Sequence, residues 1–168
     1  MHRQSKRLYH IITTIIVATA AISYFGMACG DGISYHHTVI TEQHKHVPDT
    51  TQDVYRQVYW ARYVDWSITT PMLLLDLSLL AGLTGGHIFL AIVADLIMVL
   101  TGLFAAFGTE SNPSKWGYYA IACIAYLVIV WHLALHGRAQ AMSKGGRVGT
   151  LFASIAGFTL ILWTAYPM

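Results

Sequence analysis

The stretch Arg62–Leu80, RYVDWSITTPMLLLDLSLL, is long and apolar enough to form a membrane-spanning helix, yet it contains two acidic residues. Each residue of an α-helix turns the chain by about 100°, so Asp65 and Asp76, which are eleven residues apart, share one face. Arg62 and Thr69 extend this polar face on either side of Asp65. Because an acid at the centre of a bilayer costs roughly 2.5–3.5 kcal/mol, we expect the face to point into a protein interior.

The composition of the whole chain also favours a membrane protein. Of its 168 residues, 55% are hydrophobic and 11% are charged, against about 25% charged in an average soluble domain. The alternative is a soluble domain with an unusually apolar core. The net charge of +2 gives no reason to expect nucleic acid as a partner. Cys29 and Cys123 lie in apolar segments, so we expect buried free thiols rather than a disulfide framework.

Five apolar segments predict an all-α transmembrane helical bundle, formed by residues 1–168 as a single incomplete domain. The expected spans cover about residues 8–29, 58–81, 87–107, 116–136 and 148–168, with an outward polar loop over 30–57 and a basic loop between the last two spans. Lysine and arginine are more abundant on one side, at Arg3, Lys6, Arg7, Arg138, Lys144 and Arg147, than on the other, at Lys45, Arg56 and Lys115. The positive-inside rule therefore predicts a cytoplasmic N-terminus.

The surroundings of the two acids differ in a way that suggests different protonation states. Arg62 favours an ionised Asp65, whereas Asp76 follows the apolar run Met72–Leu75 and is expected to be neutral. An ionised acid and a neutral acid on one path can act as proton acceptor and proton donor, and proton relays are a common function of acids inside membranes. The alternative is that both acids make only structural hydrogen bonds between helices.

The residues around these acids resemble a known family. The run Tyr59–Gly82 resembles the third helix of microbial rhodopsins, which are seven-helix retinal proteins, and is most similar to the proton-pumping branch with bacteriorhodopsin and the fungal opsins. Ala94–Gly102, ADLIMVLTG, resembles the fourth helix, and Leu162–Pro167, LWTAYP, resembles the sixth. Tyr24 fits the second helix. The resemblance thus covers helices two to six of seven.

The resemblance implies a light-driven outward proton pump with all-trans retinal as its cofactor. Asp65 is then the counter-ion and primary proton acceptor, Asp76 is the cytoplasmic proton donor, and Thr69 hydrogen-bonds to Asp65. Arg62 and Tyr24 belong to the proton path. The resemblance also implies an interhelical bond from Asp95 to Thr70. The implied retinal pocket is lined by Trp66, Thr70, Leu73, Met98, Gly102, Tyr119, Tyr126, Trp163, Tyr166 and Pro167. Aromatic residues at helical spacing can also be plain packing.

One departure from the family concerns lysine. In microbial rhodopsins a lysine of the seventh helix forms the Schiff base with retinal, whereas the lysines of this chain fall in expected tails or loops, at Lys6, Lys45, Lys115 and Lys144. We therefore expect that the chain alone neither binds retinal covalently nor pumps. The end within LWTAYPM favours a fragment of a complete pump over a shortened opsin that pairs with a complete one.

Two functions other than a proton pump are also compatible with the sequence. The alternatives are a light-sensing receptor and a non-photoactive opsin-like membrane scaffold; no nucleophile triad, phosphate loop or cysteine metal site predicts an enzyme. The expected partners are the lipid bilayer and either further copies of the chain or a complete opsin.

Two groups of histidines remain. The outward loop, for which the resemblance implies a β-hairpin, carries a weak candidate metal site at His36, His37, His44 and His46, with a solvated polar loop as the favoured reading. His132 and His136 lie one turn apart near the end of the fourth span. There we expect them to face lipid headgroups rather than to pass protons inside the bundle.

Overall fold

The computed structural model describes residues 2–45, 48–108 and 113–165. Their helices are α1 (His2–Ala28), α2 (Trp60–Ala81), α3 (Gly85–Phe107), α4 (Pro113–Trp131), the π-helix η1 (His132–Gly137), α5 (Arg138–Ser143) and α6 (Gly146–Ala165). Five helical stretches are long and apolar enough to cross a membrane, namely Arg7–Ala28, Trp60–Ala81, Gly85–Phe107, Pro113–Ser143 and Gly146–Ala165. The predicted helical transmembrane fold is confirmed.

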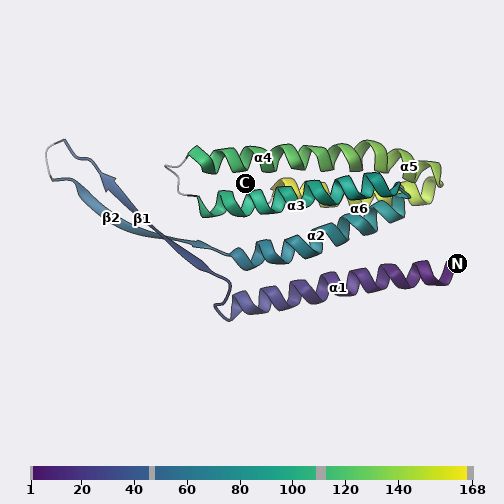
Figure 1. Ribbon diagram of the computed structural model, residues 1–168, viewed down its shortest axis with the longest axis horizontal. Helices are drawn as coiled ribbons and strands as arrows, with labels where there is room; N and C mark the ends of the chain where they lie inside the picture. Colours follow the sequence, from purple (N-terminus) through teal and green to yellow (C-terminus); the bar gives the residue numbers. More distant parts are fainter. Residues whose placement is uncertain (1, 46–47, 109–112, 166–168) are drawn as a thin grey trace.

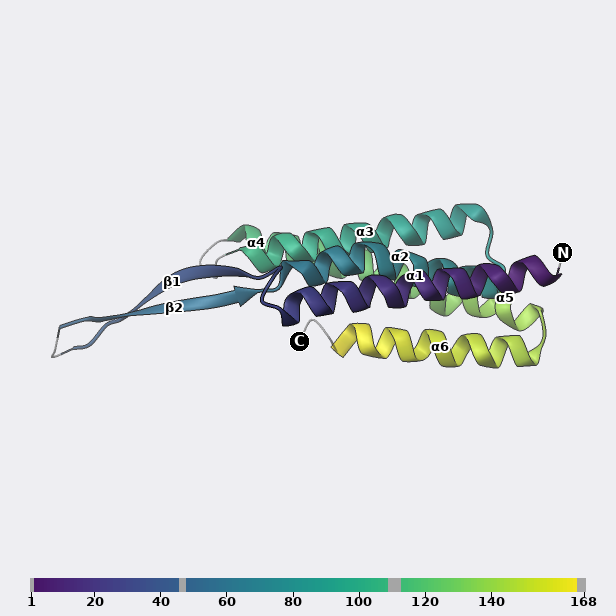
Figure 2. The same ribbon diagram turned by 90° about the horizontal axis from the view of Figure 1, so that it is seen from below.

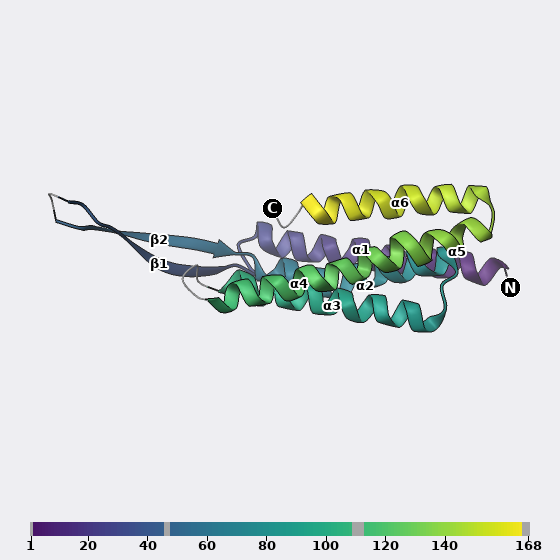
Figure 3. The ribbon, with the colours of Figure 1, turned by 90° about the horizontal axis from the view of Figure 1, so that it is seen from above.

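Helix α2, which carries the two acids, has the most helical neighbours. It packs against α1 on one side and α3 on the other, and it also contacts α6, while α4 packs along α3 (Figure 1). Figures 2 and 3 show α6 and α3 on opposite sides of the bundle, with α1 and α2 between them. The polar face of α2 can therefore lie in an interior that these helices enclose.

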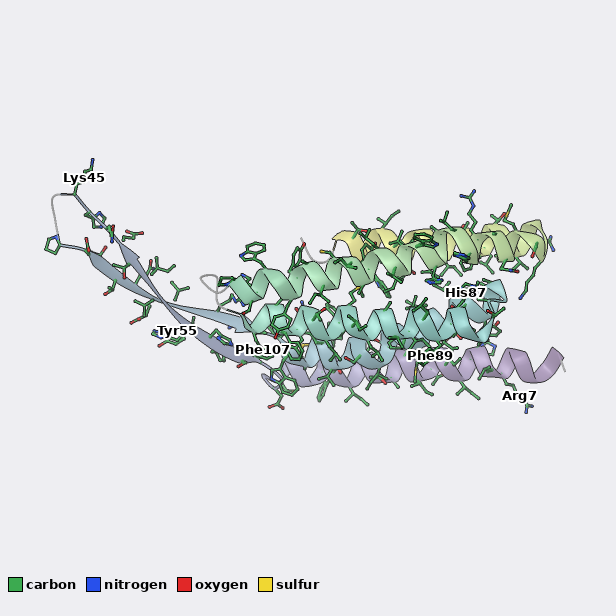
Figure 4. All side chains as sticks on the ribbon, turned by 45° about the horizontal axis from the view of Figure 1, so that its top comes forward. Arg7, Lys45, Tyr55, His87, Phe89 and Phe107 are labelled. Carbon is green, nitrogen blue, oxygen red and sulfur yellow. The ribbon has the colours of Figure 1, made fainter. Side chains whose placement is uncertain are left out.

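The largest buried cluster joins α2 to the helices that follow it. Leu74 of α2, Ile129 of α4 and Phe152 of α6 are almost completely buried in it. By contrast, large apolar side chains such as Phe158 and Phe89 are exposed, and Figure 4 shows Phe89 on the outside of the helices. An apolar exterior of this kind suits a surface that faces lipid.

The loop between α1 and α2 is an antiparallel β-hairpin, as the resemblance implied. Strand β1 (Ser34–Glu42) pairs with β2 (Thr50–Val58) in the register Ser34↔Val58 to Glu42↔Thr50. The hairpin projects beyond one end of the helices (Figure 1). The Arg56 guanidinium fastens its base to the bundle by donating to the carbonyl oxygens of Ala106 and Gly108 at the end of α3.

The helix bounds differ from the expected spans mainly at the fourth span. Helix α1 begins at His2, but its stretch that is apolar enough to cross a membrane, Arg7–Ala28, agrees with the expected 8–29. The fourth span was expected to end near residue 136 before a basic loop, but the chain stays helical to Ser143. Residues 138–143 are good helix formers without proline. The turn comes at Gly145, whose φ of +126° suits glycine.

Candidate functional site

The polar face of α2 points into the protein, as its spacing predicts. Asp65 is 2% exposed and Thr69 is also buried. Asp76 is partly buried and lies about three turns beyond Asp65 along the helix. Asp65 Oδ1 is buried without a hydrogen-bond partner among the described residues. A buried acceptor with no donor is costly, by about 1–3 kcal/mol or more when it is charged. Asp65 therefore provides a place for a donor or cation beside α2.

The hydrogen bond expected between Thr69 and the Asp65 carboxyl is not formed. The Thr69 hydroxyl instead donates to the backbone carbonyl oxygen of Asp65, at 3.0 Å. Threonine inside a helix commonly bonds to the carbonyl four residues earlier, because that acceptor lies within reach of its preferred rotamers. This bond leaves the Asp65 carboxyl available to another donor.

Arg62 lies one turn from Asp65, toward the hairpin. Its guanidinium carbon is 5.4 Å from the centre of the Tyr59 ring, a distance at which a cation interacts with an aromatic face. The side chain is partly buried. The structure therefore places a positive charge between Asp65 and the end of the bundle that carries the hairpin.

Asp76 faces α1, and this contact reveals residues that the sequence did not single out. Thr13 and Tyr9 of α1 lie close enough to the Asp76 carboxyl to interact with it electrostatically. The Thr13 hydroxyl is also 2.9 Å from the Tyr9 carbonyl oxygen. In the sequence, the signal that could have pointed to Tyr9 and Thr13 is that both are polar and stand one turn apart in an apolar helix. The same side of α1 lines an open groove, formed by His10, Thr13, Thr14, Val17, Ala18 and Ala21.

Asp95 joins α3 to α2. It is completely buried, and the Thr70 hydroxyl lies 2.7 Å from its Oδ2. The same hydroxyl is 2.7 Å from the Trp66 carbonyl oxygen. This is the interhelical bond that the resemblance implied, and it fixes the distance between the two helices beside the candidate pocket.

Several of the expected retinal-pocket residues are partly buried. Trp66 and Leu73 are partly buried on α2, and Met98 and Trp163 pack against the main apolar cluster. The Tyr63 ring meets Trp66 edge-on, with 5.4 Å between ring centres. Gly102 leaves space beside this ring, since a Cβ there would lie 3.5 Å from Tyr63 Cε1.

Other expected residues lie elsewhere. The Tyr126 hydroxyl donates to the Leu160 carbonyl oxygen at 3.0 Å and lies 2.6 Å from Thr164 Oγ1, so it ties α4 to α6. Tyr119 and Tyr24 are 42% and 48% exposed, so the described residues do not enclose either of them. Tyr166 and Pro167 lie outside the described residues.

The hairpin histidines do not come together. His37 bonds to Asp53 at 2.8 Å, His44 lies 3.1 Å from the Thr50 hydroxyl, and His36 packs against the Phe107 ring. Adjacent residues of a strand point to opposite faces, which separates His36 from His37. His46 lies outside the described residues, and the weak metal site stays unsupported by those that are described.

His132 is not at the headgroup surface as expected. It is only 8% exposed and faces His87 of α3, with 3.3 Å between the two Nδ1 atoms. His132 is the first residue of the π-helical turn η1, directly after α4, and its ring lies on the side that faces α3.

Comparison with known proteins identifies the family. The family model for bacteriorhodopsin-like proteins matches residues 1–168. Opsin-1 of Neurospora crassa is 54% identical over 165 residues, which cover 98% of this chain and 54% of that protein. The opsin-like protein carO of Fusarium fujikuroi is 36% identical over 98% of this chain and 52% of its own length.

Solved structures of light-driven proton pumps are similar to this chain in both fold and sequence. The light-driven proton pump LR (Mac) from Leptosphaeria maculans has a TM-score of 0.91 and 66% identity, over 97% of this chain and 66% of that one. The light-driven proton pump of Coccomyxa subellipsoidea has a TM-score of 0.80 and 37% identity. The chain spans about half the length of the curated relatives it matches. On these matches the chain belongs to the bacteriorhodopsin-like family.

Proposed function

We propose that the chain forms the acid-bearing part of a light-driven outward proton pump that uses retinal. The observation that carries the proposal is the pair Asp65 and Asp76 on one interior face of α2, with Asp65 Oδ1 buried and open to a donor. The similarity to the Leptosphaeria maculans proton pump supports it. The chain is accordingly proposed to act in ion transport and not as an enzyme.

The residues present fit retinal. Asp65 offers a buried carboxylate oxygen without a partner among the described residues, and such an oxygen suits a cationic nitrogen. When bound, retinal would supply a light-absorbing polyene, and the cationic nitrogen would be that of the lysine joined to it as a Schiff base. The residues proposed to hold it are Trp66, Thr70 and Leu73 from α2, Met98 and Gly102 from α3, and Trp163 from α6.

The two acids have different proposed tasks because their surroundings differ. Asp65 accepts a proton at its free carboxylate oxygen, and Arg62, toward the hairpin, favours onward release at that end. Asp76, whose Oδ1 is also buried without a partner among the described residues and which lies near Thr13 of α1, supplies a proton from the other end of the face. With the N-terminus in the cytoplasm, as the basic residues favour, the proton moves outward.

The lysines limit what residues 1–168 do by themselves. Lys45 lies near the tip of the hairpin (Figure 4), Lys115 is in the first turn of α4, and Lys144 Nζ is 3.4 Å from the Leu80 carbonyl oxygen. Lys6 lies near the start of α1. These positions are at the ends of helices or in the hairpin, away from Asp65. The proposed pump therefore takes its Schiff-base lysine from another segment or from a partner opsin in the same bilayer.

Proton transport in vesicles tests the proposal. Residues 1–168 are assembled with the lysine-bearing remainder of the Leptosphaeria maculans pump and all-trans retinal, and the external pH is recorded under illumination. We expect light-driven proton transport that Asp65→Asn abolishes and that Asp76→Asn slows. Asp53→Asn, on the exposed hairpin, is the matched control and leaves transport intact. Transport that persists in Asp65→Asn overturns the proposal, as does a pigment that forms but moves no protons.

A further inference from the structure

The end of the bundle opposite the hairpin carries basic residues without acidic ones. Of the eight acidic residues in the sequence, three lie inside α2 and α3. The other five fall between α1 and α2 or between α3 and α4, the connections at the hairpin end, at Asp31, Glu42, Asp49, Asp53 and Glu110. Six of the ten lysines and arginines lie toward the opposite end, at Arg3, Lys6, Arg7, Arg138, Lys144 and Arg147. That end therefore has a positive charge that no acidic residue of its own balances.

Two exposed arginines flank the turn that joins α5 to α6. Arg138 is the first residue of α5, and Arg147 is the second residue of α6. Within the described part of the chain, neither forms an ion pair with an acidic side chain. Figure 1 shows α5 and the start of α6 at the end of the bundle where α1 begins, and Figure 4 shows Arg7 there, pointing away from the helices. The basic residues of this end thus face outward.

Lys144 attaches the same turn to the rest of the bundle. Its Nζ donates to the Leu80 carbonyl oxygen at 3.4 Å, beside Gly82, where α2 ends with a φ of +78°. A cation is favourable at the C-terminus of a helix because it balances the partial negative charge of the last carbonyl groups. Lys144 is therefore already engaged, and of the three cations at this turn Arg138 and Arg147 remain for an outside partner.

Exposed apolar side chains continue the helix face of each arginine toward the middle of the bundle. Leu135 precedes Arg138 by three residues and Leu151 follows Arg147 by four, so each leucine lies one turn from its arginine on the same side. The two leucines are 60% and 51% exposed, and Trp131, one turn before Leu135, is 60% exposed. A surface that is apolar along the helices and cationic at their end matches a phospholipid, with its acyl chains and its phosphate, better than it matches a soluble acidic partner.

We propose that the turn between α5 and α6 is a docking surface for phospholipids with a net negative headgroup, in the leaflet at the end opposite the hairpin. Arg138 and Arg147 donate hydrogen bonds to headgroup oxygens, and Leu135 and Leu151 contact the acyl chains. Each basic residue near an anionic lipid surface strengthens the attraction about fivefold, so the surface selects anionic over zwitterionic headgroups. This docking is independent of retinal and of proton transport.

Native mass spectrometry of the whole chain in detergent micelles tests this surface, because it resolves each bound lipid. The chain is titrated with phosphatidylserine or with phosphatidylcholine, without retinal. We expect the first phosphatidylserine to bind more tightly than phosphatidylcholine, by about fivefold if one arginine engages it and about 25-fold if both do. Arg138→Gln and Arg147→Gln should each reduce this preference, and the double variant should bring it close to one. Higher salt should also reduce the preference, because it screens exposed charges.

A control variant separates this surface from a general effect of charge. Lys45→Gln removes a cation near the hairpin tip and should leave the preference unchanged. Equal binding of the two lipids by the intact chain overturns the proposal, as does a preference that persists in the double variant or is lost in Lys45→Gln. If a second copy of the chain covers the arginines instead, the spectra show dimers that the double variant loses and no lipid preference, which also overturns it.

Discussion

Thr70 and Asp95 join α2 to α3 through a buried hydrogen bond, and a double-mutant cycle can measure its strength. Thr70→Val and Asp95→Leu replace each side chain by an apolar one of similar size, singly and together. The bond is 2.7 Å long and Asp95 is completely buried, so water cannot take the place of Thr70 at the Asp95 carboxyl. Thr70→Val leaves the buried Asp95 carboxyl without this partner, which costs about 1–3 kcal/mol, whereas after Asp95→Leu the Thr70 hydroxyl still has the Trp66 carbonyl oxygen.

The coupling energy that remains in the cycle is smaller than either single effect. Hydrogen bonds between helices in membranes average about 0.6 kcal/mol in such cycles and reach about 1.7 kcal/mol. The short distance and full burial place this pair in the upper part of that range, at about 1–1.7 kcal/mol. The assay is unfolding of the chain in mixed micelles of increasing denaturing detergent, followed by tryptophan fluorescence.

A third substitution controls for threonine itself. Thr101 is also in α3, and its hydroxyl bonds within its own helix, to the Ile97 carbonyl oxygen at 2.6 Å. Thr101→Val combined with Asp95→Leu should show no coupling. If Thr70→Val and Asp95→Leu are also additive within about 0.3 kcal/mol, the bond does not join the helices as described.

Three further predictions concern the packing of helices and hairpin. Gly137→Ala should destabilise the chain by about 1–3 kcal/mol in the same unfolding assay, because the added Cβ would lie 2.6 Å from Phe152 Cζ. Tyr126→Phe should cost about 1 kcal/mol in that assay, since its hydroxyl links α4 to Leu160 and Thr164 of α6. Arg56→Ala should leave the helices folded but speed hydrogen exchange in the hairpin, because it removes the bonds to the end of α3.

Each of these predictions has a matched control and a contrary outcome. Gly157→Ala meets nothing within 4 Å and should be neutral; a neutral Gly137→Ala would mean that η1 does not pack against α6 as described. Tyr35→Phe, on the exposed hairpin, should not change stability, and an equally silent Tyr126→Phe would refute the link between α4 and α6. Unchanged hairpin exchange in Arg56→Ala would show that the hairpin has another attachment.

Hydropathy and helical spacing were sufficient to predict the spans and the interior face of α2. Those signals are local: the acids Asp65 and Asp76 are costly in lipid wherever they stand, so their shared face had to turn inward. The resemblance added the hairpin and the bond between Thr70 and Asp95. These features depend on patterns within one helix or on a familiar run of residues.

What the sequence did not predict depends on contacts between distant segments. The π-helical turn at His132–Gly137 accompanies the packing of Phe152 on Gly137, and no local pattern marks it. Nothing in the sequence marks His87, a single histidine at the start of a helix, because its partner His132 lies 45 residues later in the chain. The bond from Thr69 reached the backbone rather than the carboxyl because both acceptors lie within reach, and spacing alone does not choose between them.

The central claim is that Asp65 accepts a proton and Asp76 donates one along the same interior face of α2. Light-minus-dark infrared spectra of the retinal-loaded pump, assembled with a lysine-bearing helix, measure this most directly, with Asp65→Asn and Asp76→Asn used to assign the carboxyl bands. We predict that illumination first gives a protonated carboxyl signal that disappears in Asp65→Asn, followed by loss of one that disappears in Asp76→Asn. A photocycle in which neither signal changes would contradict the account.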